Sequence, residues 1–146
     1  MKIKKLDELQ YIKRGNIFKH CLFTIIGLLL IYLTLVQSDI VLVSQRNALA
    51  LIILFIVSMF CVEMIYYDIY PLSEKRQWIL YLFAGLAGIF VIVISSRGLI
   101  SGETRFIENE ILSDSGAGII MGGLCLIILI AYLIKKVYNK TKGDVS

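Results

Sequence analysis

One carboxylate, Glu63, lies deep inside a long apolar stretch of the chain. From residue 48 to residue 62 this stretch contains no charge, proline or glycine. Tyr66 and Tyr67 follow Glu63 by three and four positions, so on a helix all three residues share a face. A phenol can donate a hydrogen bond to a carboxylate, which lowers the cost of holding the acid in apolar surroundings.

Acids inside membranes often mark proton or cation pathways, so Glu63 is a candidate proton or ion site. His20, the single histidine of the chain, is a second candidate, because a His–Glu pair can exchange protons near neutral pH. Glu63 is expected about 8 Å from a membrane boundary. The competing interpretation is an interfacial Glu held by Tyr66, Tyr67 or a basic group of another helix, together with a solvated His.

Four apolar runs position these residues, at 17–36, 48–70, 77–96 and 117–134. A run of about 20 residues on a helix crosses a hydrocarbon core about 30 Å thick. The chain is 58% hydrophobic with a mean hydropathy of +0.82, above the roughly 45–50% apolar content of soluble domains. Backbone in lipid must satisfy its own hydrogen bonds. We therefore predict an all-α, four-span transmembrane helical bundle that forms one membrane domain, residues 1–146.

The basic residues indicate the topology of these spans. Six of the fifteen Lys and Arg residues lie in residues 1–19, two in the turn 71–76 and four after Leu133. The predicted outer loops, 37–47 and 97–116, contain the other three. The positive-inside rule then places both termini in the cytoplasm of a cell that holds the protein in its plasma membrane. The net charge of +4 therefore reflects topology, and we expect no nucleic-acid partner.

Small residues mark two of the predicted spans as contact helices. Gly85 and Gly88 lie near the middle of the third span, and Gly118 and Gly122 form a G-x-x-x-G in the fourth. Small residues one turn apart let two helix backbones approach closely. The pattern leaves open whether that contact is within one chain or between two, and we favour packing within the chain.

The second outer loop, 97–116, is acidic and partly apolar. Its acids are Glu103, Glu108, Glu110 and Asp114. Apolar residues interleave with these acids, which is compatible with a short amphipathic helix. A negative loop with apolar anchors could receive a cationic partner. The competing interpretation is a solvated loop that topology keeps free of Lys and Arg.

The sequence offers little for catalysis. It contains no G-x-S-x-G, no H-E-x-x-H and no phosphate-binding glycine loop. Its three cysteines are scattered through apolar runs without a Cys-x-x-Cys pair, which argues against a metal site. We therefore expect no enzymatic activity, no cofactor and no bound metal.

Two functions remain. The first is an accessory or interaction protein that binds another membrane protein or peptide, and in size and topology the chain is similar to immunity proteins against pore-forming bacteriocins. The second is a proton-coupled exporter of small cations that works as a homo-oligomer through Glu63. That architecture resembles the small multidrug resistance family, with four short helices, one membrane Glu and glycines in the last helix. The family carries its Glu in the first helix and has shorter loops.

Overall fold

The computed structural model describes residues 8–69, 74–108 and 110–143. It contains the helices α1 (Glu8–Gln37), α2 (Gln45–Tyr66), α3 (Glu74–Ile100) and α4 (Asp114–Gly143), and the short strands β1 (Ile107–Glu108) and β2 (Ile111–Leu112). Each helix contains a segment long and apolar enough to cross a membrane. The predicted all-α architecture with four candidate spans is therefore confirmed.

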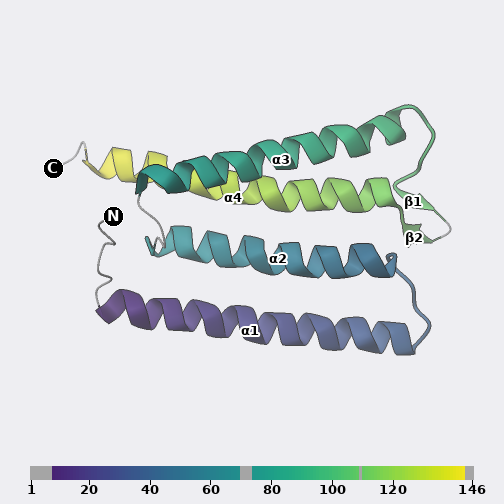
Figure 1. Ribbon diagram of the computed structural model, residues 1–146, viewed down its shortest axis with the longest axis horizontal. Helices are drawn as coiled ribbons and strands as arrows, with labels where there is room; N and C mark the ends of the chain where they lie inside the picture. The colour runs from purple at the N-terminus through teal and green to yellow at the C-terminus, as the bar shows by residue number, and fades with distance from the viewer. Residues whose placement is uncertain (1–7, 70–73, 109, 144–146) are drawn as a thin grey trace.

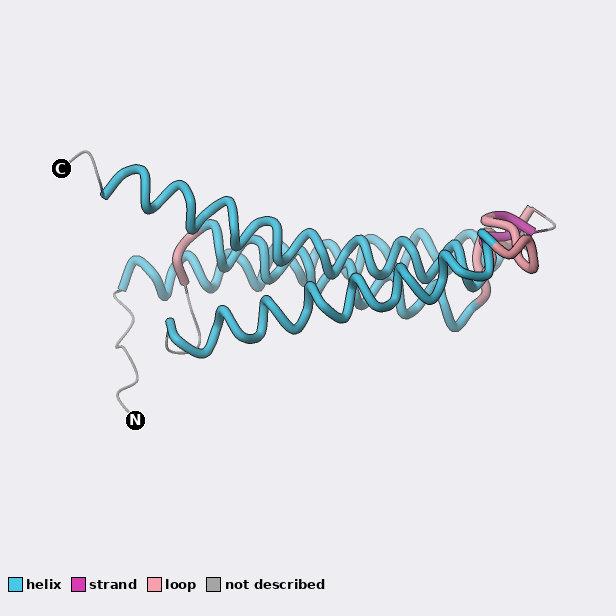
Figure 2. Tube along the Cα trace, turned by 90° about the horizontal axis from the view of Figure 1, so that it is seen from above, coloured by secondary structure: helices cyan, strands magenta, loops and turns pink. Residues whose placement is uncertain are grey.

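The helices run up and down and lie side by side in the order α1, α2, α4, α3 (Figure 1). α1 packs on α2, α2 packs on α4, and α4 packs on α3. The helices also overlap closely when the molecule is turned by 90° (Figure 2). α1 begins and α4 ends at one end of the molecule, which we call the terminal end. The opposite end, where α1 meets α2 and α3 meets α4 through their connecting loops, is the hairpin end.

The helices are longer than the predicted spans, with one exception. α1 begins at Glu8, α3 continues to Ile100, and α4 continues to Gly143, because polar residues extend these helices beyond their apolar parts. α2 instead ends at Tyr66, before the predicted end of the span at residue 70. Residue 70 and residues 71–73 of the predicted turn lie outside the described residues, whereas residues 74–76 of that turn belong to α3.

A left-handed Asp residue explains the early end of α2. Asp68 has φ 55°, and the N–H groups of Asp68 and Ile69 donate to the carbonyls of Ile65 and Met64. These two hydrogen bonds form a Schellman motif, which terminates a helix and satisfies its last carbonyl groups. α1 ends in the same way, with Asp39 at φ 54°. Aspartate is one of the few residues other than glycine that tolerates this conformation.

α2 separates two small cores near the terminal end. On one side, Ile17 and Cys21 of α1 are buried against Met64 and Ile69. On the other side, Ile65 is buried with Tyr81 of α3 and Ile128 of α4. α2 is thus the helix through which α1 is joined to the α3–α4 pair.

Polar contacts tie α2 to α4 at three levels. At the hairpin end, Asn47 Nδ2 donates to Asp114 Oδ1 over 2.6 Å. Between the ends, Ser58 Oγ donates to the carbonyl of Leu124 over 3.2 Å. At the terminal end, Lys135 Nζ of α4 lies 2.9 Å from Asp68 Oδ2. Because polar groups buried in apolar surroundings need partners, these contacts fix the register of the two helices.

α3 and α4 approach each other at backbone distance. A Cβ atom added at Gly88 would lie 2.7 Å from the Gly122 carbonyl oxygen, and a Cβ added at Gly122 would lie 2.7 Å from the Gly88 carbonyl oxygen. In the same contact, Gly85 faces Leu129 and Gly118 faces Ser95. The structure therefore places all four glycines singled out in the sequence between two helices of one chain.

The neighbouring glycines Gly122 and Gly123 provide a matched test of this contact. We expect Gly122→Ala to lower the free energy of unfolding by about 1–3 kcal/mol, because the new methyl group would overlap backbone atoms of α3. Gly123→Ala should be neutral or stabilising by up to about 1 kcal/mol, since no atom lies within 4 Å of a Cβ there. Thermal unfolding in detergent, followed by circular dichroism, measures both. Equal stability of the two variants would contradict the close approach.

Candidate functional site

The structure brings the two sequence-predicted titratable residues together. Glu63 lies in the last turn of α2, and His20 lies on α1, which runs antiparallel to it. His20 Nδ1 is 3.6 Å from Glu63 Oε2. The side chain of Glu63 is 26% exposed and that of His20 is 62% exposed, so the imidazole is the more accessible of the two groups.

Glu63 Oε2 is buried and has no hydrogen-bond partner among the described residues. The separation from His20 Nδ1 is too long for a hydrogen bond. A buried acceptor without a donor raises the free energy of the folded state. A small shift of the imidazole would bring a donor within hydrogen-bond distance of this oxygen.

The tyrosines do not take the predicted role. No described hydrogen bond joins the Tyr66 or Tyr67 phenol to Glu63. Their side chains are 70% and 39% exposed, and their rings meet edge to face with centroids 5.1 Å apart. The ammonium group of Lys13 on α1 lies 5.4 Å from the centroid of the Tyr67 ring. Tyr66 is the last residue of α2, and the Tyr67 N–H still donates to the Glu63 carbonyl over 3.0 Å. Both tyrosines therefore keep the predicted helical spacing from Glu63, but their phenols make no described hydrogen bond to its carboxylate.

Lys135 is a residue at this end that sequence reasoning missed. Besides its ion pair with Asp68, its Nζ donates to the carbonyl oxygen of Tyr66 over 3.0 Å. That carbonyl belongs to the last turn of α2, where helices leave backbone acceptors free and where a cation is electrostatically favourable. The sequence signal was a Lys directly after an apolar run, which alone indicates only a residue that reaches toward the membrane surface.

At the hairpin end, the two loops of the chain meet. β1 and β2 pair as an antiparallel hairpin, and the Leu112 N–H donates to the Leu42 carbonyl of the first loop. The amphipathic helix predicted for this region is therefore absent from its described part. The reason is that both ends of the predicted loop belong to helices, since α3 continues to Ile100 and α4 begins at Asp114. The remaining described residues form turns and extended backbone.

The four predicted acids of this loop separate into two groups. Asp114 begins α4, where it accepts the Asn47 hydrogen bond and lies 3.5 Å from Arg46 NH2. Glu103, Glu108 and Glu110 lie on the loop itself and are exposed. Glu108 Oε1 accepts a hydrogen bond from the Arg105 backbone N–H over 2.9 Å. All four acids are exposed, and Asp114 differs from the other three in its contacts with Asn47 and Arg46.

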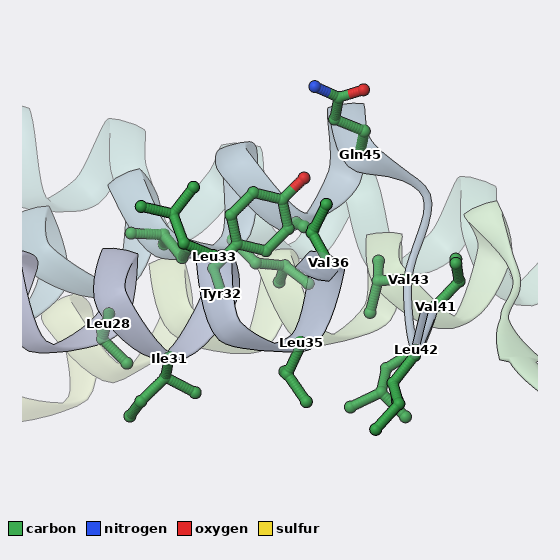
Figure 3. A pocket seen from close by; sticks show the side chains of 14 residues that line it. Leu28, Ile31, Tyr32, Leu33, Leu35, Val36, Val41, Leu42, Val43 and Gln45 are labelled. Atoms are coloured by element: carbon green, nitrogen blue, oxygen red, sulfur yellow. The ribbon is translucent and has the colours of Figure 1, made fainter. Parts of the chain in front are cut away.

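An apolar groove of about 510 Å³ lies between α1 and α2 near the hairpin end. Figure 3 shows side chains of α1 and of residues 41–43 around it, with the amide of Gln45 at its upper margin. None of its lining residues is charged. Glu63 and His20 do not line the groove, so the acid pair and the groove are separate features.

Comparison of the chain with protein-family models, with curated proteins and with solved structures gives no match. Within the described residues, no three His, Cys, Asp or Glu side chains gather in a way that could hold a metal ion. Two candidate sites therefore stand out, namely the His20–Glu63 pair and the acidic hairpin end. They belong to different ends of the molecule, so mutations can separate their roles.

The neighbours Lys135 and Lys136 test the contact at the terminal end. We expect Lys135→Met to lower the free energy of unfolding by about 1–2 kcal/mol, because it removes an ion pair and a charge-assisted hydrogen bond to the end of α2. Lys136 is exposed, and Lys136→Met should leave stability nearly unchanged. Thermal unfolding in detergent measures both variants. A similar loss in both would show that the net charge of this end matters rather than the Lys135 contacts.

Proposed function

We propose that this chain is a multi-pass protein of the cell membrane that binds another membrane protein or a peptide at its hairpin end. By the positive-inside rule, the terminal end faces the cytoplasm and the hairpin end faces outward. The protein acts by binding, without an enzymatic reaction or a cofactor. It belongs to the class of accessory and immunity-like membrane proteins.

The exposed surface of the hairpin end supports this proposal. Glu103, Glu108 and Glu110 lie there beside two large apolar side chains, Phe106 and Ile107, which are 43% and 57% exposed. Interfaces commonly combine apolar anchors with a polar rim. A negative potential attracts a positive partner and excludes a negative one. A cationic, amphipathic segment is therefore the partner that this surface fits best.

The contacts within the chain make this surface a stable platform. The Leu112–Leu42 hydrogen bond connects the loop between α3 and α4 to the loop between α1 and α2. The Asn47–Asp114 hydrogen bond connects the start of α4 to α2. A preorganised surface loses less conformational entropy when a partner binds. Arg46 is already paired with Asp114, so it does not cancel the charge of the three exposed acids.

A matched double variant removes two negative charges from the loop that contains β1 and β2 and keeps the hydrogen bond that residue 108 accepts. In the double variant Glu108→Gln, Glu110→Gln, the amide oxygen introduced at position 108 can still accept from the Arg105 backbone N–H. We expect recovery of the partner from native membranes to fall several-fold, since each exposed ion pair contributes about 0.2–1 kcal/mol. Recovery with the unmodified chain should also fall above an ionic strength of about 0.15 M, where screening is strong. Purification in mild detergent at native abundance, followed by quantitative mass spectrometry, measures both effects.

A control double variant, Glu8→Gln with Glu74→Gln, removes the same number of negative charges at the terminal end, where α1 and α3 begin. This control should retain the partner. Undiminished recovery with the hairpin variant, or an equal decrease with the control, would contradict binding at the hairpin.

The second candidate function is proton-coupled export of small cations by a homo-oligomer. The buried, unpartnered oxygen of Glu63 beside His20 favours it, because exporters of this kind need a carboxylate that exchanges its proton for the cation. Neither the apolar groove nor the shallow hollow along residues 133–141 has a charged lining residue. In this candidate function, a second copy of the chain completes the cation pathway to Glu63.

Proteoliposomes test the exporter directly. If Glu63 carries the coupling proton, Glu63→Gln should abolish cation uptake driven by a pH gradient, whereas Glu108→Gln should leave it intact. Ethidium fluorescence in vesicles with a pH gradient measures the uptake. Absence of gradient-driven uptake by the unmodified protein, or equal uptake by the Glu63→Gln variant, would exclude this candidate.

A further inference from the structure

α1 is joined to the other helices chiefly through α2. Within the described chain, the buried residues of α1 are Ile17 and Cys21, both in the half of the helix nearest the terminal end. Phe18 packs there on Phe60, with ring centroids 5.2 Å apart. In the other half of α1, the apolar groove separates it from α2. The packed contact that holds α1 is therefore confined to part of its length.

The His20–Glu63 pair lies inside that packed contact. His20 is adjacent in sequence to the buried Cys21, and Glu63 is adjacent to the buried Met64. The polar contacts between α2 and α4 are complete, since Asn47, Ser58 and Lys135 each make a hydrogen bond. Between α1 and α2, by contrast, the His20–Glu63 contact leaves a buried oxygen unsatisfied. The α1–α2 contact is thus the one in which protonation of the neighbouring side chain can add a donor to an unsatisfied oxygen.

The other ionisable groups around the pair come from three segments. α1 contributes Lys13, Arg14, Lys19 and Cys21, α2 and its end contribute Cys61, Tyr66, Tyr67 and Asp68, and α4 contributes Lys135. Lys13 and Arg14 each lie over an aromatic ring, and Lys135 is paired with Asp68. Lys19 is exposed. This arrangement leaves His20 as the group that can supply positive charge to Glu63.

We propose that His20 and Glu63 form a proton-dependent contact between α1 and α2, which we call the clasp. Its protonation state sets the fraction of molecules in which α1 is packed on α2, which we call seated. When the imidazole takes up a proton, both of its nitrogens become donors and it carries a positive charge. It then attracts the ionised Glu63 and supplies the missing donor to Oε2. When the imidazole is neutral, the carboxylate remains buried without a cation, and the contact between the helices weakens.

The direction of the pH dependence follows from this mechanism. Seating of α1 strengthens as the pH falls through the range in which histidines ordinarily titrate, about pH 8 to about pH 5. At still lower pH, protonation of Glu63 removes the ion pair and the seating weakens again. This behaviour needs no partner at the hairpin end, so it goes beyond the proposed binding function and can be tested without it.

A distance measurement across the row of helices tests the clasp. Nitroxide labels at Phe23 of α1 and Phe83 of α3, attached through clickable unnatural amino acids, leave the native cysteines in place. Both side chains are exposed, at 71% and 65%, so the labels do not disturb packing. Double electron–electron resonance in nanodiscs at about pH 5 and about pH 8 gives the populations of seated and displaced α1. We expect a single short distance at the lower pH and a second, longer and broader population at the higher pH.

The size of the response is limited by the number of protons. For one proton, the ratio of seated to displaced α1 changes by at most about tenfold per pH unit. His20→Gln and Glu63→Gln should each abolish this pH response. Lys19→Gln, which removes an exposed neighbouring cation, should retain it. The exchanged pair, His20→Glu with Glu63→His, should restore it, because the same two groups then face each other in reverse.

Circular dichroism of each variant confirms that its helices are formed before distances are compared. An unmodified protein whose distance distribution is the same at both pH values would overturn the proposal. A His20→Gln variant that keeps the full pH response would also overturn it. Loss of the response in the Lys19→Gln variant would assign the effect to surface charge, and the clasp would again be overturned.

Discussion

The absence of water from the hydrocarbon core is the constraint on which the rest of this structure depends. Backbone groups in that region must bond within their own helix, which accounts for four long helices and for loops confined to the two ends. Side-chain polarity is restricted in the same way. The polar contacts between α2 and α4 accordingly lie at Asn47, Ser58 and Lys135, and each has a definite partner.

The same constraint makes close packing the main source of cohesion between helices. Lipid tails are as apolar as Leu side chains, so helices associate through close contact rather than through burial from water. Gly88 and Gly122 allow α3 and α4 to approach at backbone distance. α1 lacks a comparable contact, and the groove beside it shows how incomplete its packing is. The molecule therefore combines a firmly joined set, α2, α4 and α3, with a more loosely held α1.

Because of this unequal packing, the two candidate sites differ in how firmly the surrounding helices are packed. The acidic loop between α3 and α4 belongs to the firmly joined set of helices. Asp114 binds Asn47 of α2, and Leu112 binds Leu42 in the loop between α1 and α2. The His20–Glu63 pair lies where α1 meets α2. A rigid surface suits recognition of a partner, whereas a loosely held helix suits a change of position. Binding at one end and proton response at the other are therefore compatible within one chain.

The sequence by itself determined the class of fold, because hydropathy alone reports whether a segment can cross a membrane. It also singled out Glu63, His20 and the four packing glycines, since an acid or a glycine pattern is conspicuous in an apolar run. The end of α2 depended instead on the backbone of Asp68, whose left-handed conformation no hydropathy pattern reveals.

Only the tertiary structure decided which residues meet across helices. The order α1, α2, α4, α3 placed Lys135 on Asp68 and Asn47 on Asp114, pairs that lie far apart in the sequence. Local pattern carries no information about such pairs, because they depend on how helices pack laterally. The hairpin of β1 and β2 likewise formed through pairing with itself and with Leu42. The local pairing of β1 with β2 and one long-range hydrogen bond, from Leu112 to Leu42, thus replace the amphipathic helix.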